Sequence, residues 1–354
     1  MIQMTLFQLA AEGARRLEES GSPDAGNDAR QLLMAAFHLD MTHFLLDRMQ
    51  PLPDSGRTRS AIRLYQEMIE QRRSRIPLQQ ILGVQEFMGL EFYVNRHVLI
   101  PRQDTETLVE LVLKEHRAGD SLLDLCTGSG CIAISLALKG QFTSVTATDI
   151  SGEALEVAKR NAEKLLGAVK AEKAASEAAE PGKAASEVAE PGKAASEAAE
   201  PEKAASEAAE PGIIGQEREE PEKEGLVFRL CQGDLFEALP RTASGDTPRY
   251  DIITANPPYI PTDIIPTLEP EVRDHEPVLA LDGTRDGVYY YRRIAQAAGA
   301  YLTDRGRIYV EIGHDQGTQV SAILRDQGYQ HIRVIKDLAG NDRVVSAAVS
   351  SYNK

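Results

Sequence analysis

The chain of 354 residues exceeds the usual length of one domain, so two domains with additional segments are expected. Its 42% of hydrophobic residues can form a sizeable core, and no apolar run approaches the length of a membrane span. The net charge of −15 argues against a protein that wraps nucleic acid, and we expect no direct nucleic-acid contact.

The cysteines and histidines form no pattern that suits a metal or a disulfide. Cys126, Cys131 and Cys231 contain no Cys-x-x-Cys pair, and the seven histidines lack ligand spacing. We therefore expect neither a metal site nor a disulfide framework. Because the first residues also lack a basic region followed by an apolar stretch, a cytoplasmic protein that binds no membrane is expected.

Residues 1–83 are predicted to form a small helical domain. Apolar residues recur at helical spacing in three stripes, the clearest of which contains Ala29, Leu32 and Leu33. The basic run Arg72–Arg75 could contact RNA on a ribosome-bound partner. We favour a simpler interpretation, in which these charges lie in solvent at the C-terminus of a helix, because short basic clusters are weak evidence.

Residues 84–100 are predicted to form a hairpin that links two domains, because apolar residues cluster around Met88-Gly89. From residue 101 to residue 354 the pattern is α/β, and the last two strands are close enough to form a hairpin with one antiparallel strand. The expected strands lie near 121–125, 145–149, 227–231, 250–255, 306–312, 331–336 and 343–350.

A glycine-rich loop follows the first of these strands. The segment Asp124–Ala133 combines a strand end, the glycines Gly128 and Gly130, and the start of a helix, which favours negative groups. The next strand ends in Asp149, about 20 residues further on, where a carboxylate can bind ribose hydroxyls. Gly128, Gly130 and Ala133 also satisfy a dinucleotide fingerprint, so a nicotinamide enzyme remains open on this loop alone.

An acidic insertion, residues 168–224, interrupts the α/β pattern after an expected helix from Gly152 to Leu166. It holds four copies of a ten-residue unit between Lys173 and Gly212, and about half of the net charge. The repeats offer almost no large apolar residue and contain prolines that interrupt helices. We interpret the insertion as a flexible linker, and joining Gly167 to Gly225 is expected to leave the fold and the activity intact.

The motif Asn256-Pro257-Pro258-Tyr259 follows the apolar strand 250–255. Two prolines force the chain out of the sheet at the carboxyl end of a strand, where ligands bind in α/β folds. The Asn256 side-chain oxygen and the Pro257 carbonyl can face one planar NH2 group, and the Tyr259 ring can stack on it. The motif therefore predicts a site that binds an amide or an amino-purine nitrogen, whereas an ordinary proline turn is the simpler alternative.

Together these segments resemble the HemK/PrmC-type peptide chain release factor glutamine methyltransferases, within the class I S-adenosylmethionine-dependent methyltransferases. The resemblance covers most of the chain outside the insertion. It implies an α/β fold with a seven-stranded Rossmann-like methyltransferase sheet and a small N-terminal helical domain. It also implies S-adenosyl-L-methionine as methyl donor and bacterial-type release factors as partners. The matching segments are Pro77–Gly83, Glu86–Phe92, Val98–Arg102, Asp104–Glu106, Asp124–Gly130, Gly233–Phe236, Asn256–Pro261, Glu311–Gly313 and Ala339–Arg343.

The same resemblance implies roles for individual residues. The methionine end of the cofactor would be lined by Cys126, Thr127, Gly128, Ser129 and Gly130. Asp149 would bind the ribose, Asp234 and Leu235 would border the adenine, and Asn256 would lie beside the cofactor. Asn256, Pro257, Pro258 and Tyr259 would hold the substrate glutamine, and catalysis would depend on Asn256, Pro257 and Tyr259. Many relatives have glycine at position 126 and some have an aromatic residue at position 235, which weakens the expectation of adenine stacking on Leu235.

Three other functions stay open from the sequence. Methylation of a glutamine in a ribosomal protein would use the same site. Methylation of adenine N6 in nucleic acid would present the same NH2 group, but it needs a recognition domain that the sequence does not suggest. A non-catalytic module that retains a nucleotide fold is the third, and the intact Asn256–Tyr259 motif argues against it.

Overall fold

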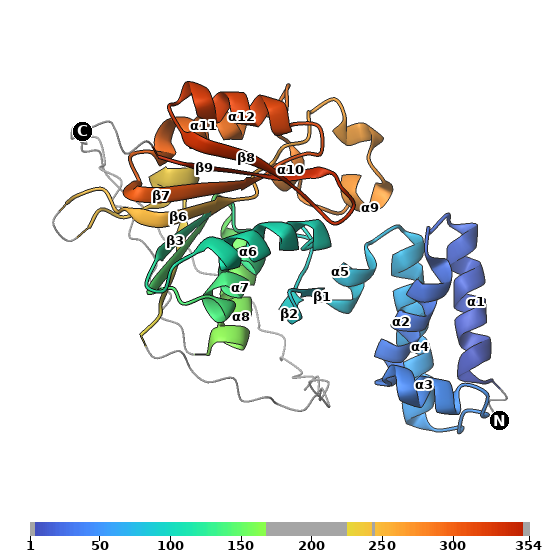
Figure 1. Cartoon of the computed structure of the whole chain (residues 1–354). Coiled ribbons are helices and arrows are strands. Elements are labelled where there is room, and N and C mark those ends of the chain that lie inside the picture. The colour runs from blue at the N-terminus through green and yellow to red at the C-terminus, as the bar shows by residue number, and fades with distance from the viewer. Residues whose placement is uncertain (1–3, 168–224, 243–244, 350–354) are drawn as a thin grey trace, which may run out of the picture. The chain divides into compact units, whose positions relative to one another are not determined.

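The computed structural model describes residues 4–167, 225–242 and 245–349 (Figure 1). The acidic repeats lie outside these described residues, and so does the prediction that residues 168–224 form a flexible linker. The described parts of 1–174 and 221–354 belong to one compact unit, so the predicted domain boundaries at 83 and 100 stay predictions.

The N-terminal helices pack around the apolar stripes that the sequence predicts. Leu9, Leu32 and Tyr65 lie in one buried cluster. Gly13 permits this packing, since a Cβ there would lie 1.9 Å from the Tyr65 hydroxyl oxygen. Side chains of Thr5, Asp40 and Ser55 cap three of the helices. These helices are α1 (Leu6–Glu19), α2 (Ala25–Phe37), α3 (Met41–Asp47), α4 (Gly56–Arg73) and α5 (Leu78–Leu82).

A short antiparallel hairpin follows, as predicted, and consists of β1 (Val84–Phe87) and β2 (Leu90–Tyr93). Its two-residue turn is Met88-Gly89, and both residues have positive φ, 54° and 74°. This is the backbone combination that matches the twist of two paired strands, and glycine adopts it without strain.

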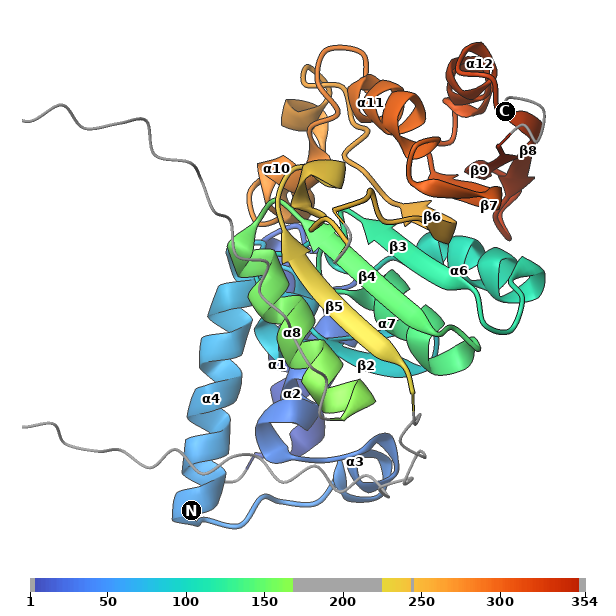
Figure 2. The same ribbon diagram turned by 90° about the vertical axis from the view of Figure 1, so that its left-hand side faces the viewer.

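In the described part of the chain, seven strands form one sheet in the order β5-β4-β3-β6-β7-β9-β8. All neighbours are parallel except those of β9, which runs antiparallel to both β7 and β8. The α/β class and the antiparallel strand are therefore confirmed. Figure 2 shows β5, β4, β3 and β6 beside one another with their carboxyl ends at one edge. The strands are β3 (Ser121–Leu125), β4 (Ser144–Asp149), β5 (Val227–Gln232), β6 (Tyr250–Ala255), β7 (Leu302–Glu311), β8 (Gln330–Lys336) and β9 (Asp342–Ala348).

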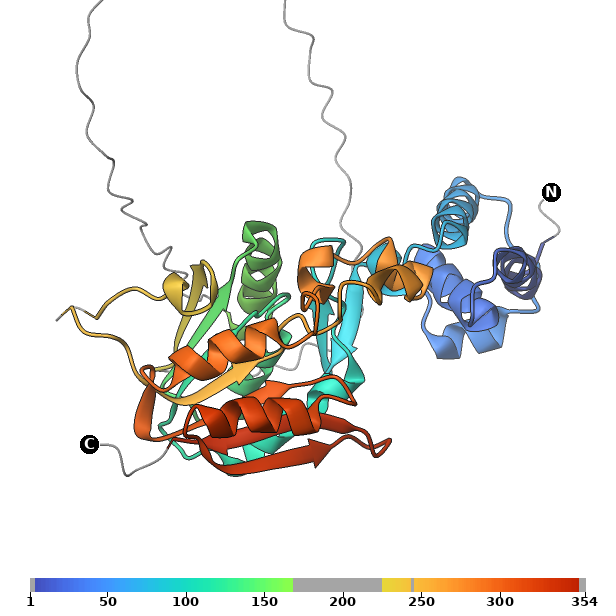
Figure 3. The ribbon, with the colours of Figure 1, turned by 90° about the horizontal axis from the view of Figure 1, so that it is seen from above.

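Helices cover both faces of the sheet, because successive strand residues point to opposite sides. Leu122 packs in the cluster with α6 (Gln103–Glu115), α7 (Cys131–Lys139) and α8 (Gly152–Leu166). Leu123, the next residue, packs in the cluster with α11 (Tyr289–Ala298) and α12 (Gly317–Asp326), which lie side by side in Figure 3. The segment between β6 and α11 contains the short elements η2 (Ile265–Thr267), α9 (Pro270–Arg273) and α10 (Val278–Leu281), and η1 (Leu235–Ala238) follows β5.

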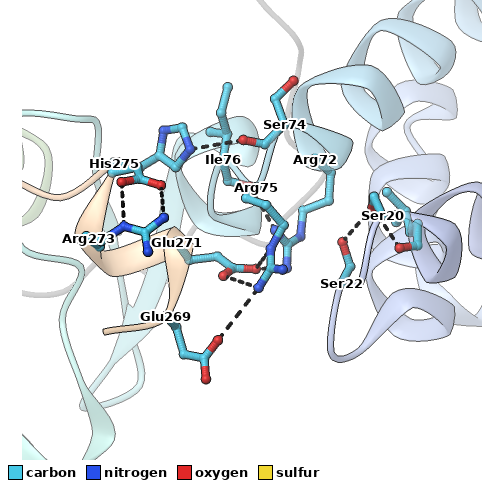
Figure 4. Close-up of polar contacts among 12 residues, drawn as sticks. Ser20, Ser22, Arg72, Ser74, Arg75, Ile76, Glu269, Glu271, Arg273 and His275 are labelled. Carbon is cyan, nitrogen blue, oxygen red and sulfur yellow. Dashed lines mark hydrogen bonds and ion pairs between the residues drawn. The ribbon is translucent and has the colours of Figure 1, made fainter. Parts of the chain in front are cut away.

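The basic run at the end of α4 binds α9, which contradicts its predicted location in solvent. Arg72 is only 4% exposed and pairs with Asp28 at 2.6 Å and with Glu271 at 2.8 Å. Arg75 pairs with Glu271 at 2.6 Å, and the Ser74 carbonyl contacts the His275 ring (Figure 4). The prediction was wrong because the carboxylates come from distant parts of the sequence.

None of the described helices is long and apolar enough to cross a bilayer.

Candidate active site

The glycine-rich loop turns between β3 and α7 through three residues with positive φ: Cys126 (58°), Gly128 (56°) and Gly130 (81°). Gly130 allows close helix packing, since a Cβ there would lie 2.8 Å from Ile134 Cδ1 and 3.3 Å from Ala158 Cβ. Gly128 differs, because no described atom lies within 4 Å of its ideal Cβ. Its backbone therefore borders open space that a ligand can approach closely.

Asp124, at the end of β3, connects this loop to β6. Its side chain is completely buried and accepts hydrogen bonds from Thr127 Oγ1 at 2.6 Å and Thr254 Oγ1 at 2.7 Å. Burial raises the pKa of Asp124 to about 7, although the two hydroxyls favour its ionised form. The carboxyl group thus fixes the start of the loop against the neighbouring strand.

Asp149, at the end of β4, contacts the same loop. Its Oδ2 accepts a hydrogen bond from the Gly128 backbone N–H at 2.8 Å, and its Oδ1 accepts one from the Ser151 N–H at 2.9 Å. Burial raises the pKa of Asp149, and these two bonds oppose the rise. A carboxylate has about four acceptor positions, so the group can still accept hydrogen bonds from a ligand.

The residues after β5 form another wall of the site. Asp234 accepts two hydrogen bonds from Arg293 Nη1, at 3.0 and 2.9 Å. Leu235 has a φ of 50°, which is uncommon for a residue with a side chain and typical of functional sites. Ile150 and Tyr290 add apolar surface to the pocket lining. The Ile150 side chain is 49% exposed, and Tyr290 is half-buried.

The motif after β6 leaves the sheet as predicted. Pro257 and Pro258 are buried, and Asn256 is half-buried. The Tyr259 carbonyl accepts a hydrogen bond from Gln316 Nε2 at 3.0 Å, and its ring packs against the core on the α11 side of the sheet. Burial raises the pKa of Tyr259. The turn is therefore anchored from behind, with Asn256 directed toward the pocket.

One pocket unites most of these residues at the carboxyl ends of β3, β4, β5 and β6. It has about 1070 Å³ of empty space, part of it open solvent. The strand order reverses between β3 and β6, and such a switch point is the usual ligand site in open α/β sheets. The predicted residues in its lining are Cys126, Thr127, Gly128, Ser129, Asp149, Asp234, Leu235, Asn256 and Pro258.

Gly130, Pro257 and Tyr259 were predicted to belong to the site and lie outside this lining. Conversely, sequence reasoning missed several lining residues, including Arg102, Thr105, Ile150 and Tyr290. Arg102 and Thr105 come from segments that carry the family resemblance, so that signal could have identified them. The exposed Ile150 had a weaker signal, its position directly after Asp149.

Comparisons with known proteins show which proteins the chain is similar to. The family profile described as the PrmC N-terminal domain matches residues 8–83, and the profile of the methyltransferase small domain matches residues 103–187. A release factor glutamine methyltransferase of Agrobacterium fabrum is 34% identical over 338 residues, which cover 94% of this chain and 93% of that protein. The corresponding protein of Geobacter sulfurreducens is 32% identical over 333 residues, with 94% and 93% coverage.

One similar solved structure is also a release factor methyltransferase. It is the release factor-specific protein-(glutamine-N5) methyltransferase of Alicyclobacillus acidocaldarius, which is 25% identical. The match covers 73% of this chain and 99% of that chain, with a TM-score of 0.33.

Proposed function

The chain belongs to the family of release factor glutamine methyltransferases, and we propose that it methylates the side-chain amide nitrogen of the glutamine in the Gly-Gly-Gln motif of bacterial-type peptide chain release factors. The observation that carries this proposal is the single pocket that joins the glycine-rich loop and Asp149 to Asn256. One half of it suits a nucleoside with a charged tail, and the other half suits a planar NH2 group.

The residues of the first half fit S-adenosyl-L-methionine. Gly128 leaves room beside the loop backbone, and Asp149 retains acceptor positions for ribose hydroxyls. Ile150 and Leu235 offer apolar surface against which the flat adenine base can pack. This contact would take the place of stacking on an aromatic ring, which position 235 lacks. When bound, this cofactor supplies an electrophilic methyl group on a sulfonium.

The second half would hold the amide of the substrate. The Asn256 side-chain oxygen and the Pro257 carbonyl would each accept one N–H of the glutamine side chain. The consecutive prolines have fixed φ, and the Gln316 bond to the Tyr259 carbonyl holds the end of the turn. The two acceptors would therefore be fixed before the substrate arrives.

Catalysis would depend on position and electrostatics. An amide nitrogen is a poor nucleophile because its lone pair is delocalised into the carbonyl group. By binding both N–H groups, Asn256 and Pro257 would direct that lone pair out of the amide plane toward the methyl donor, and they would stabilise positive charge that develops on the nitrogen. No strongly basic side chain is needed, since the nitrogen becomes acidic once it is methylated.

The direct test is incubation of the full chain with methyl-labelled S-adenosyl-L-methionine and a purified bacterial release factor, followed by peptide mass mapping. We expect one methyl group on the glutamine of the Gly-Gly-Gln loop. A release factor with this glutamine replaced by alanine is the matched control and should remain unlabelled. Labelling of a ribosomal protein or of nucleic acid in place of the release factor would contradict the proposal.

A further inference from the structure

Glu311 lies directly behind the predicted substrate site. It is the last residue of β7, which runs parallel to β6 with Ala255 beside Val310. Asn256 directly follows Ala255 and Glu311 directly follows Val310, so the two residues meet at the carboxyl ends of these strands. The Asn256 side chain also affects the Glu311 carboxyl group, whose pKa it lowers, so the two side chains are neighbours.

The Glu311 carboxyl group is buried, and no cation among the described residues forms an ion pair with it. Glu311 is 2% exposed, and the side chains of Thr105 and Asn256 lie close enough to favour its ionised form. Its Oε2 atom has no hydrogen-bond partner among the described residues. The charge of Arg343 lowers the pKa of Glu311, but the Arg343 guanidinium pairs with Asp104 and Asp337, both at 3.0 Å.

Such a group is costly for the fold. An ionised carboxylate in the interior loses its hydration, and an oxygen without a partner regains none of it. An apolar side chain of similar volume would be cheaper at this position. Retention of the carboxylate beside Asn256 therefore points to a role in the site.

We propose that Glu311 is a positioning residue that holds the Asn256 amide with its nitrogen toward β7 and its oxygen toward the pocket. This inference rests on the proposed function, in which the Asn256 oxygen accepts an N–H of the substrate glutamine. Thr105 and Asn256 both line the pocket, whereas Glu311 does not, so Glu311 acts through them.

The physical reason is the two-fold ambiguity of an amide side chain. Asparagine can rotate by half a turn and exchange its NH2 group with its oxygen at little cost in shape. An ionised carboxylate only accepts hydrogen bonds, so it selects the orientation in which NH2 faces Glu311. A charge-assisted bond favours that orientation by about tenfold or more.

Protonation of Glu311 would remove this selection, because a carboxylic acid can also donate to the Asn256 oxygen. Burial raises the pKa of Glu311 to about 7, against the lowering effect of Thr105 and Arg343. Correct orientation of Asn256 is then lost as the pH falls through 7. The ionisable groups that face Glu311 from the surrounding elements are Asp104, Cys131, Tyr259, Tyr291 and Arg343.

The test compares Glu311→Gln and Glu311→Leu with the wild type, all as full chains with S-adenosyl-L-methionine and a release factor. We expect Glu311→Leu to lower kcat about tenfold or more, since no acceptor remains for the Asn256 nitrogen. Glu311→Gln restores a neutral acceptor, so its loss should be smaller, about threefold. The wild-type rate should rise between pH 6 and pH 8, and Glu311→Gln should flatten that profile.

Two further readouts separate positioning from a structural role. The melting temperature of Glu311→Gln at pH 8 should equal or exceed that of the wild type. The double variant Asn256→Ala with Glu311→Leu should be no slower than Asn256→Ala, because Glu311 acts through Asn256. Additive losses, wild-type rates in Glu311→Leu, or an unchanged pH profile in Glu311→Gln would overturn the inference. Failure of the wild type to methylate any glutamine would instead contradict the proposed function, on which this inference depends.

Discussion

Arg72 and Glu271 are 199 positions apart in the sequence, and their side chains form an ion pair of 2.8 Å (Figure 4). Arg72 also binds Asp28, so one guanidinium connects α2, α4 and α9. Glu271 also accepts two hydrogen bonds from Arg75. α9 belongs to the segment that continues from the Asn256 turn and leads to the pocket wall around Leu279. The N-terminal helices and one wall of the site are thus connected through buried and partly buried charges.

Glu271→Gln should weaken this connection measurably. A neutral amide cannot satisfy both arginines, and we expect a loss of about 1–3 kcal/mol in the free energy of unfolding at pH 7. The matched control is Glu269→Gln. Glu269 is 82% exposed, and its distance of 3.8 Å from Arg75 is too long for a hydrogen bond. Denaturant titration of both variants checks the prediction, and equal stabilities of the two would contradict it.

The same ion pairs give a pH dependence. Burial would raise the pKa of Glu271, but hydrogen bonds from Arg75 and Arg72 outweigh it and lower the pKa to about 2. A lowered carboxyl pKa adds stability above the unfolded value of 4.5, and this stability is lost as the pH falls toward 2. The stability difference between wild type and Glu271→Gln should therefore shrink between pH 4.5 and pH 2. A constant difference across that range would show that charge does not matter.

Asp149→Ala should weaken cofactor binding and also disturb the loop. Two lost hydrogen bonds to ribose hydroxyls would cost about 1.5–3 kcal/mol each, so the Kd should rise at least tenfold. Because Gly128 and Ser151 lose their acceptor, the melting temperature should fall as well. Calorimetric titration with S-adenosyl-L-methionine separates the two effects. Lower stability with an unchanged Kd would leave Asp149 with only a structural role.

The strands and most long helices could be predicted because periodicity is local. The predicted strand 250–255 coincides with β6, and the predicted helix Gly152–Leu166 coincides with α8. β7 begins earlier than expected, at Leu302, because the polar residues Thr303 to Arg305 conceal its start. Short elements such as α9 and α10 were missed, since four residues carry no period.

The site was predictable where a motif stands on a strand end. The loop at Gly128, the carboxylate of Asp149 and the turn at Asn256 all lie on one pocket, as the strand order requires. Ile150 and the partners of Arg72 were not predictable in this way. Their roles depend on which side chains the fold brings opposite them, and neither a motif nor a period records that.

Asn256→Ala should remove most turnover and leave cofactor affinity nearly unchanged. Loss of one pre-organised polar contact to the reacting group typically costs about 10²–10³ in kcat. Asn256→Asp is a sharper variant, because its carboxylate would lie beside Glu311 and the two could not both ionise cheaply. Single-turnover rates and cofactor Kd values for both variants check this. Near wild-type rates would contradict the role of Asn256 in binding the amide.

Two glycines of one loop offer a matched pair, because they have positive φ for different reasons. Gly130→Ala should lower the melting temperature, since the new methyl group would lie 2.8 Å from Ile134 Cδ1 and near Ala158. Gly128→Ala meets no described atom within 4 Å, so its cost to the fold is only that of a φ of 56°, about 1 kcal/mol. Its methyl group would instead enter the space proposed for the cofactor. We therefore expect Gly128→Ala to raise the Kd for S-adenosyl-L-methionine more than Gly130→Ala does, with the opposite order in thermal stability. Melting curves and titrations of the two variants measure both orders. If Gly128→Ala bound the cofactor as tightly as the wild type, the loop backbone would not lie against the ligand. The proposal that this loop binds the cofactor would then be wrong.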